Sequence, residues 1–312
     1  MPTVLISGGT GLVGKRLTQL LTAKGYSVII LARQTCLLSI RQSNISYAHW
    51  DIVNQTIDAT AIAQADYIIH LAGANVAEKR WTVKRKNEII ETRTQSSALL
   101  VKALKEIPNK VKAVVSASAI GWYGANTAES VQNGFKEEAI HDHQFLGETC
   151  KLWEESIRSV EALGKRLVKL RIGIVLSKDG GVIKEFLKPL QLGVAAIIGN
   201  GKQVISWIHI DDVCRMFIYA LENENLSGVY NAVAPNTATN QQLTIALAKQ
   251  YTKFFIPIHI PKFILQWVLG EMSIEVLKSV TVSSQKIAAT GFKFNYTTIQ
   301  EAVLQLLTKN IL

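Results

Sequence analysis

The first residues of the chain constrain its fold more strongly than any other segment. The apolar run 4–7 leads into Gly8-Gly9-Thr10-Gly11-Leu12-Val13-Gly14, and an amphipathic stretch containing Leu17, Leu20 and Leu21 follows. This pattern predicts a strand, a tight glycine loop and a helix. Because a pyrophosphate approaches the backbone N–H groups of a helix N-terminus only where no Cβ intervenes, we interpret the loop as a dinucleotide site. The alternative is a structural turn without a ligand.

The glycines of this loop have different expected roles. Gly8 takes the sharp turn, Gly11 lets phosphate approach the backbone, and Gly14 allows the helix to pack closely on the strand. We assign cofactor contacts in the loop to Gly8, Thr10, Gly11, Leu12, Val13 and Gly14.

The end of the second expected strand indicates which dinucleotide binds. Arg33 follows this strand, where an NAD-binding fold usually places an acidic residue on the ribose 2′-hydroxyl. The first acidic residue of the whole chain is Asp51. No carboxylate in this stretch would repel a 2′-phosphate, and Arg33 can bind one through charge-assisted hydrogen bonds. We therefore predict NADP(H) as the cofactor; the alternative for Arg33 is a solvated cation at a strand end.

Length and composition narrow the class of protein. The 312 residues are 48% hydrophobic and 19% charged, as is typical of a globular chain with a large core. No stretch of eighteen uncharged apolar residues occurs, and the sequence begins directly with a core strand. We expect neither a signal peptide nor a membrane span, and we predict a cytoplasmic protein. Three scattered cysteines predict neither a disulfide framework nor a metal site.

The net charge of +10 raises the question of nucleic-acid binding. Lysine and arginine are spread along the chain, and one dense run, residues 79–86, leads into an expected helix through Arg93. We interpret this run as a solvated helix face, because no aromatic platform or helix-turn-helix spacing accompanies it. We do not expect a nucleic-acid partner, since a basic surface also suits an anionic cofactor or a nucleotide-linked substrate.

Buried strands alternate with amphipathic helices along most of the chain. The expected strands are 4–7, 28–32, 67–71, 113–116 and 167–172. This alternation predicts an α/β fold with a Rossmann-type, doubly wound parallel sheet. The segment 204–213, a helix to Leu221 and the run 229–232 are expected to return the chain to this sheet.

The C-terminal part changes character. Longer loops and expected helices at 262–269, 274–280 and 298–307 predict a smaller, mostly helical lobe. We assign residues 1–175 and 206–235 to an NADP-binding domain. Residues 176–205 and 236–312 are assigned to a substrate lobe.

Several motifs together resemble the extended short-chain dehydrogenase/reductases, the superfamily of nucleotide-sugar epimerases and dehydratases. They are the glycine loop, His70-Leu71-Ala72-Gly73, Ser116-Ala117-Ser118 with Tyr123-Gly124, Leu170-Arg171 and Trp207-Ile208-His209-Ile210-Asp211-Asp212-Val213. Arg80-Trp81-Thr82, Trp153-Glu154 and Gly270-Glu271-Met272 are similar to an atypical subgroup, the epimerase family proteins with a C-terminal domain of unknown function. The resemblance covers the whole chain. It implies cofactor contacts from Leu71, Ala72, Gly73 and Ser116, and contact of Asp51 with the adenine edge.

The chain departs from the larger family at the catalytic dyad. Active members of that family use a Tyr followed four residues later by Lys, and none of the eight tyrosines here has Lys at that spacing. Leu146 and Cys150 occupy the matching positions of the expected catalytic helix. Neither side chain can replace a phenol beside a permanent cation.

Two catalytic candidates remain. The resemblance places Ser118 at the position of a substrate-positioning hydroxyl; the alternative is a strand-end hydroxyl bonded to the backbone. Tyr123 is the nearest phenol that could donate a proton, and packing in a loop is its alternative role. His141 and His143 lie in a polar loop that we interpret as surface, without a metal site, because no further Cys or His completes a ligand set.

We predict an NADP(H)-binding oxidoreductase or epimerase-like enzyme with a small, sugar-like or anionic substrate. The alternative, from a different class, is a non-catalytic NADP(H) sensor or scaffold in which the cofactor changes a binding surface.

Overall fold

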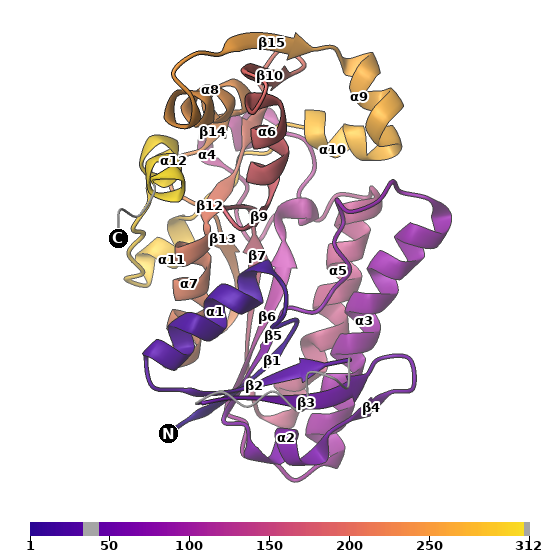
Figure 1. Cartoon of the computed structure of the whole chain (residues 1–312). Helices are drawn as coiled ribbons and strands as arrows, with labels where there is room; N and C mark the ends of the chain where they lie inside the picture. Colours follow the sequence, from indigo (N-terminus) through magenta and orange to yellow (C-terminus); the bar gives the residue numbers. More distant parts are fainter. Residues whose placement is uncertain (34–43, 309–312) are drawn as a thin grey trace.

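An eight-stranded sheet forms the centre of the protein, whose computed structural model describes residues 1–33 and 44–308. Its strands lie in the order β13-β7-β6-β5-β1-β2-β3-β4 (Figure 1). They are β1 (Thr3–Ser7), β2 (Ser27–Ala32), β3 (Ile45–Asp51), β4 (Thr56–Ile57), β5 (Tyr67–His70), β6 (Ala113–Ala119), β7 (Arg166–Ile172) and β13 (Gly228–Ala232). All neighbours pair in parallel except β3 with β4. The strand order runs outward from β1 in both directions, so the predicted doubly wound sheet is confirmed.

Helices cover both faces of this sheet. They are α1 (Leu12–Ala23), α2 (Ala59–Gln64), α3 (Val83–Glu106), α5 (Phe145–Ile157) and α7 (Ile210–Glu222). Figure 1 shows α1 and α7 on one face and α2, α3 and α5 on the other. In β1, Val4 and Ile6 pack into the core beneath α1 and α7, whereas Leu5 packs beneath α2 and α3. Burial on both faces explains why the strands read as continuous apolar runs.

The chain returns to the sheet at β13, as predicted, and β13 pairs in parallel with β7. The segment before β13 does not join the eight-stranded sheet. β12 (Trp207–His209) pairs with β8 (Ile174–Ser177) in a separate small sheet that also contains β9 (Gly180–Gly181). Helix α7 follows β12 directly, and the Nδ1 of its N-cap residue His209 accepts a hydrogen bond from the Asp211 N–H.

A second group of elements lies beyond the carboxyl end of the sheet, at the top of Figure 1. Its members are α6 (Val182–Leu190), β10 (Val194–Ile198), α8 (Asn240–Tyr251), β15 (Ile256–Ile260), α9 (Lys262–Leu269) and α10 (Ser273–Leu277). Helices dominate this group, and β10 and β15 form a parallel pair. The expected division into an NADP-binding domain and a substrate lobe stays a proposal.

The remaining short elements complete the chain. They are α4 (Ala128–Asn133), β11 (Val204–Ile205), β14 (Ala238–Thr239), α11 (Gln285–Ala289), α12 (Ile299–Leu307) and the 3-10 turns Ile120–Trp122, Arg158–Leu163 and Gly270–Met272. The expected helix at 262–269 is confirmed by α9. The expected helix at 274–280 is shorter, because the chain extends after Leu277 and the Val280 N–H donates to the Val204 carbonyl.

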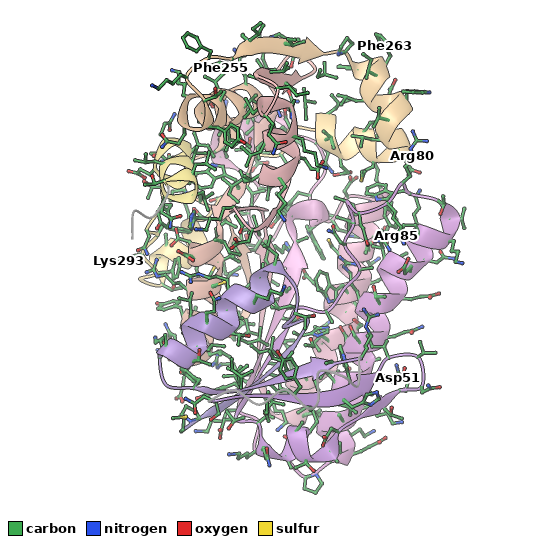
Figure 2. The ribbon with its side chains drawn as sticks, in the orientation of Figure 1. Asp51, Arg80, Arg85, Phe255, Phe263 and Lys293 are labelled. Carbon is green, nitrogen blue, oxygen red and sulfur yellow. The ribbon has the colours of Figure 1, made fainter. Side chains whose placement is uncertain are left out.

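One arginine connects the two groups of elements. Arg80 precedes α3, and its guanidinium donates to the carbonyls of Trp267 and Val268 at the end of α9. Figure 2 shows Arg80 below Phe263, a residue of α9. Within residues 1–33 and 44–308, none of the helices combines the length and the apolar character that a membrane span requires.

Candidate cofactor and substrate site

The glycine loop joins β1 to α1 at the carboxyl edge of the sheet. Gly8 has a φ of +73°, and a Cβ there would lie 2.9 Å from the carbonyl carbon of Leu71. A Cβ on Gly14 would lie 2.6 Å from the Cα of Gly9, closer than packed atoms tolerate. These two glycines have the turn and packing roles predicted for them. A Cβ on Gly11 would have only the Gly8 oxygen within 4 Å, at 3.2 Å, so this residue faces comparatively open space.

The first turn of α1 has unused hydrogen-bond donors. Gly11 is the N-cap residue and provides no side chain, and the turn contains no acidic residue. In the described part of the chain, the N–H groups of Leu12, Val13 and Gly14 donate no backbone hydrogen bond. Free donors at the positive end of a helix dipole favour a bound anion. The residues present therefore fit a dinucleotide pyrophosphate.

Two predicted cofactor residues lie at neighbouring strand ends. Arg33 directly follows β2 and is exposed. Asp51 ends β3, and its carboxylate accepts hydrogen bonds from the N–H groups of Asn54, at 3.0 Å, and Val53, at 2.8 Å. Hydrogen bonding from Asn54 lowers the pKa of Asp51. Figure 2 shows Asp51 well separated from Arg80. Asp51 thus stabilises its own turn, and its contact with adenine stays a prediction.

The predicted cofactor residues on the other side of β1 follow β5 and lie within β6. Leu71, Ala72 and Gly73 follow β5, and the close approach of Gly8 to Leu71 places this segment beside the glycine loop. Ser116 is buried, and its hydroxyl donates to the Ala117 carbonyl. Contact of these residues with a cofactor stays a prediction.

His70, at the end of β5, is fully buried among three serines, of which Ser96 is the most distant, with its Oγ 3.4 Å from the His70 Nε2. Its Nδ1 lies 2.6 Å from the Ser7 Oγ, and its Nε2 lies 3.1 Å from the Ser97 Oγ. The pKa of His70 is lowered to about 3, mainly by burial and secondly by the nearby charge of Arg93. The imidazole is therefore neutral at physiological pH and connects β1, β5 and α3 beneath the cofactor loop.

We expect His70 to make the fold sensitive to acid. An unfolded chain protonates histidine near pH 6.5, whereas the folded chain keeps this group neutral down to about pH 3. The free energy of unfolding should therefore fall as the pH decreases between these values. Because of this one group, the free energy of unfolding should be about 2 kcal/mol lower at pH 5 than at pH 7. Urea unfolding at both pH values measures this effect. The loss of unfolding free energy from pH 7 to pH 5 should be smaller in His70→Gln than in the wild type. Equal losses would contradict a neutral, buried His70.

A buried ion pair lies beside the end of β6. Arg171 of β7 and Glu154 of α5 are 2% and 6% exposed. The Arg171 Nε lies 2.8 Å from the Glu154 Oε1, and Nη2 lies 3.1 Å from Oε2. Burial by itself lowers the pKa of Arg171, but the hydrogen bonds and charge of Glu154 raise it overall. The Ser118 hydroxyl donates to the same carboxylate at 2.7 Å, so the ion pair orients this catalytic candidate.

Tyr123 belongs to the same network and is completely buried. Its hydroxyl donates to the Asn231 Oδ1 at 2.6 Å and accepts from the Arg171 Nη1 at 3.0 Å. Burial raises the pKa of Tyr123 to about 12, so the group is a neutral phenol at pH 7. This arrangement favours a role in positioning Arg171, and the predicted catalytic role stays a prediction.

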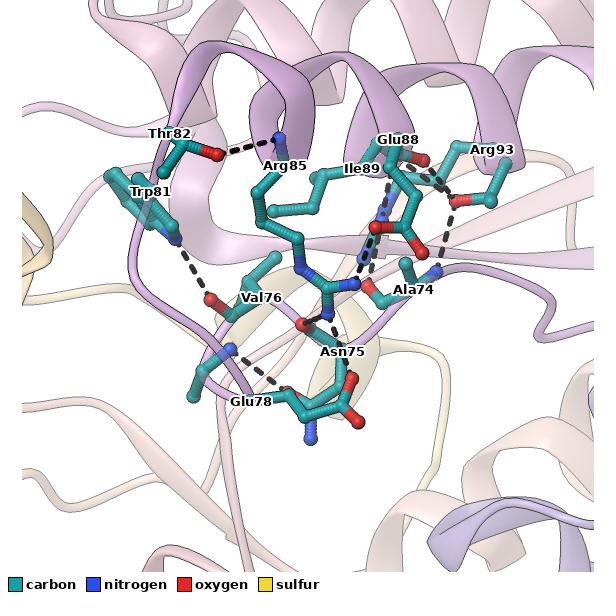
Figure 3. Close-up of polar contacts among 12 residues, drawn as sticks. Ala74, Asn75, Val76, Glu78, Trp81, Thr82, Arg85, Glu88, Ile89 and Arg93 are labelled. Atoms are coloured by element: carbon teal, nitrogen blue, oxygen red, sulfur yellow. Dashed lines mark hydrogen bonds and ion pairs between the residues drawn. The ribbon is translucent and has the colours of Figure 1, made fainter.

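Arg85 holds the loop between β5 and α3. The side chain is 5% exposed, so the prediction that the basic run 79–86 is a solvated face is wrong for this residue. Its Nη1 donates to Glu88, and its Nη2 donates to Glu78 and to the Asn75 carbonyl (Figure 3). A charged group can be buried where carboxylates and a carbonyl accept its hydrogen bonds. Arg85 is therefore a structural clamp for this loop.

A cleft of about 230 Å³ lies between the starts of α3 and α5 and the C-terminal elements. It is lined by Trp81, Lys86, Gln144, Phe145, Glu271, Ile274 and Glu275. Trp81 and Phe145 meet edge to face with ring centroids 4.8 Å apart, and Lys86 forms a 2.5 Å ion pair with Glu271 across the cleft. Aromatic walls with a few charged groups are typical of small-molecule sites.

Comparison with protein families matches most of the chain. Residues 4–232 match the NAD dependent epimerase/dehydratase family, and residues 260–306 match a domain of unknown function, DUF1731. The first match alone covers more than half of the chain. This chain belongs to the NAD dependent epimerase/dehydratase family.

Individual relatives agree with this assignment. Epimerase family protein YfhF of Bacillus subtilis is 33% identical over 306 residues, which cover 97% of each chain. The crystal structure of human epimerase family protein SDR39U1 (isoform 2) with NADPH has a TM-score of 0.83 at 28% identity and covers 98% of this chain and 99% of that one. The UDP-glucose 4-epimerase of Thermotoga maritima, at 20% identity, has a TM-score of 0.76 and covers 98% of this chain and 97% of its own, which supports the fold alone. The predicted resemblance to the epimerase family proteins is confirmed.

In this family member, the two dyad positions face the turn after β6. A Cβ on Gly121 would lie 3.2 Å from the Leu146 Cβ and 3.5 Å from the Cys150 Sγ. The Cys150 thiol donates to the Ala119 carbonyl, and burial raises its pKa to about 12. The side chains at the expected dyad positions are thus aliphatic and a neutral thiol, and their match to the phenol and cation of the larger family stays a prediction.

A carboxylate joins the two histidines of the loop before α5. The Glu148 Oε1 lies 3.0 Å from the His141 Nε2 and 3.4 Å from the His143 Nδ1. Hydrogen bonding from His141 lowers the pKa of Glu148. The sequence interpretation overlooked Glu148 as the third member of this set, and the three groups are close enough to share a cation. With His143 80% exposed, the cluster is a surface feature, as predicted for the loop.

Sequence reasoning missed the pairing of Glu154 with Arg171 and the packing of Arg93 on the Trp153 ring. Arg93 lies one turn after Ile89 and one turn before Ser97, and both of these residues are buried. A charged residue on an otherwise buried helix face was the available signal.

Proposed function

We propose that the chain is an NADP(H)-binding oxidoreductase or epimerase-like enzyme of the atypical short-chain dehydrogenase/reductase type. The observation that carries the proposal lies at the start of α1, where N–H groups have no partner among residues 1–33 and 44–308, beside the open approach to Gly11. The loop Gly8–Gly14 would hold the pyrophosphate, Arg33 the 2′-phosphate and Asp51 the adenine end. The segment Leu71–Gly73 and Ser116 would lie at the nicotinamide end. The NADPH in the human SDR39U1 crystal structure supports this choice of cofactor.

The chemistry of the bound cofactor is hydride transfer, while the protein binds and orients the substrate. The cleft between α3, α5 and the C-terminal elements would receive a small anionic or sugar-like molecule. Ser118 is 2% exposed, like Tyr123 a buried group. It is the stronger candidate for substrate contact, because its hydroxyl donates to Glu154 and accepts no hydrogen bond from the described residues. Tyr123 is the weaker candidate, since its hydroxyl already has both a donor and an acceptor partner.

We expect Arg33 to select NADPH over NADH. The guanidinium would attract the 2′-phosphate, and Arg33→Asp would repel it while favouring the ribose hydroxyls of NADH. Calorimetric titration should show tighter NADPH binding in the wild type and a loss or reversal of this preference in Arg33→Asp. Equal affinities for both cofactors in the wild type would contradict the assignment.

Turnover provides the test of the enzymatic proposal. Without the Tyr-Lys dyad, we expect negligible turnover of common UDP- and GDP-sugars, because general acid–base catalysis contributes on the order of 10²–10⁴-fold. A metabolite screen at the reduced-nicotinamide absorbance should reveal another substrate, and Ser118→Ala should lower its turnover about 100-fold without weakening NADPH affinity. Tyr123→Phe tests the weaker candidate in the same way: it should lower turnover without weakening NADPH affinity. Tight NADPH binding without turnover across a broad screen would instead favour the sensor or scaffold.

A further inference from the structure

Arg93 is a permanently charged residue without an acidic partner in the described part of the chain. It lies in α3, between the segment after β5 and helix α5. A Cβ on Gly73 would lie 3.0 Å from the Arg93 Cζ, and the Trp153 ring centroid lies 5.0 Å from Cζ. Burial lowers the pKa of Arg93 to about 10, so the side chain remains charged at pH 7.

The hydrogen bonds of Arg93 use one nitrogen of its guanidinium. Nη1 donates to the Ala74 carbonyl at 3.0 Å and to the Ile89 carbonyl at 2.9 Å; Figure 3 shows Arg93 beside both residues. The N–H groups on Nε and Nη2 have no acceptor among residues 1–33 and 44–308. These two nitrogens form one edge of the planar group, whose parallel N–H bonds match the two oxygens of a carboxylate.

Trp153 adds a second donor without a partner. Its indole is 5% exposed, and its Nε1–H has no acceptor in the described structure. Buried polar groups in proteins normally have partners. Arg85 Nε and Trp207 Nε1 are buried without a partner as well, so Trp153 is not unique among the described residues. Arg93, packed against Trp153, is only partly buried, so a ligand can reach its unused donors from solvent.

Arg93 lies on the same helix as one residue of the cleft. Lys86 lines the cleft and lies 5.2 Å from the Phe145 ring. Arg93 follows seven residues later, on the same face of α3 and about 10 Å further along its axis. Both cations thus contact aromatic rings of α5. Arg93 is also close enough to Cys150, at the missing Lys position, to affect the pKa of that thiol.

We propose that Arg93 binds a carboxylate of the substrate through Nε and Nη2. The inference rests on the proposed function and deepens it by naming the substrate class: a small oxo or hydroxy acid, or a sugar acid, rather than a neutral sugar. Arg93 fixes this carboxylate beside the nicotinamide end. A phosphate offers a similar pair of oxygens, so the test separates a substrate carboxylate from a phosphate of the cofactor.

The experiment uses oxalate and inorganic phosphate as probes. Calorimetry measures their binding to the full chain, both apo and saturated with NADP⁺, in the wild type, Arg93→Gln and Arg93→Lys. Arg93→Gln should weaken oxalate binding about 10- to 100-fold, and Arg93→Lys should recover only part of it because an ammonium lacks the planar fork. NADPH affinity should stay within about threefold of the wild type. Arg158→Gln, which removes an exposed arginine of the Arg158–Leu163 turn, is the matched control and should change nothing.

A second variant tests the geometry without removing the charge. Gly73→Ala places a methyl group against the flexible end of Arg93 and should displace the guanidinium while the fold is kept, so oxalate binding should weaken. Thermal unfolding confirms that each variant is folded.

Four outcomes decide the proposal. Oxalate that fails to bind the wild type, or that binds Arg93→Gln equally well, overturns it. Two results would assign Arg93 to a phosphate and also overturn the proposal. The first is phosphate that binds more tightly than oxalate and loses this affinity in Arg93→Gln, and the second is an NADPH loss in Arg93→Gln as large as the oxalate loss. Arg93-dependent oxalate binding with unchanged NADPH affinity supports it. Arg93-dependent oxalate binding by a protein that does not bind NADPH supports the carboxylate site and contradicts the cofactor proposal, so the two failures are distinguishable.

Discussion

Glu154→Leu is expected to lower the free energy of unfolding by about 3–5 kcal/mol. The substitution keeps a similar volume but removes the carboxylate that accepts two hydrogen bonds from Arg171 and one from Ser118. Arg171 is 2% exposed, so water cannot replace the lost acceptor without opening the structure. Urea unfolding at pH 7 measures the effect.

Two further variants identify burial as the cause. Glu185→Ala breaks an ion pair with Lys188 in which both side chains are 67% exposed, and it should cost less than about 1 kcal/mol. The double variant Glu154→Leu/Arg171→Met should recover part of the loss, because it leaves no uncompensated buried charge. A loss in Glu154→Leu no larger than in Glu185→Ala would contradict the structural role of the buried pair.

Gly11→Val is expected to weaken NADPH binding about 100-fold or more while the protein stays folded. Gly11 has a φ of −76°, which valine adopts without strain, and its added Cβ would approach only the Gly8 oxygen, at 3.2 Å. The side chain would stand in front of the free N–H groups of α1, and the loss of two charge-assisted hydrogen bonds to a pyrophosphate accounts for a change of this size. Calorimetric titration with NADPH provides the measurement.

Gly14→Ala is the comparison variant that shows how a substitution in this loop affects folding rather than cofactor binding. Its Cβ would meet the backbone of Gly8 and Gly9, which cannot move aside as a flexible side chain does. We therefore expect Gly14→Ala to lower thermal stability, in contrast to Gly11→Val. NADPH binding retained by Gly11→Val would mean that the glycine loop is a structural turn and that the cofactor lies elsewhere.

The order of the elements could be predicted from local sequence, but some of their ends could not. Apolar runs and glycine positions located β1, α1 and α9 closely, because periodicity depends on residues near one another in the chain. The strand expected at 113–116 stopped short of its actual end at Ala119. β6 continues to Ala119 because its pairing with β7 continues to Ile172, and a pairing partner is not encoded in the strand itself.

The sequence by itself determined the glycine loop, the family, the lack of a Tyr-Lys dyad and the cation of Arg33 in a stretch without acidic residues. Each of these is a matter of residue type and short spacing. Only the tertiary structure decided how buried polar groups pair: Arg171 with Glu154, and the Tyr123 hydroxyl with Asn231, 108 residues away. It alone placed Arg93 against Trp153, with two nitrogens that have no hydrogen-bond partner among residues 1–33 and 44–308. The physical reason is that a buried charge takes its partner from whichever strand or helix packs beside it, and that neighbour is set by the strand order and helix packing of the whole fold.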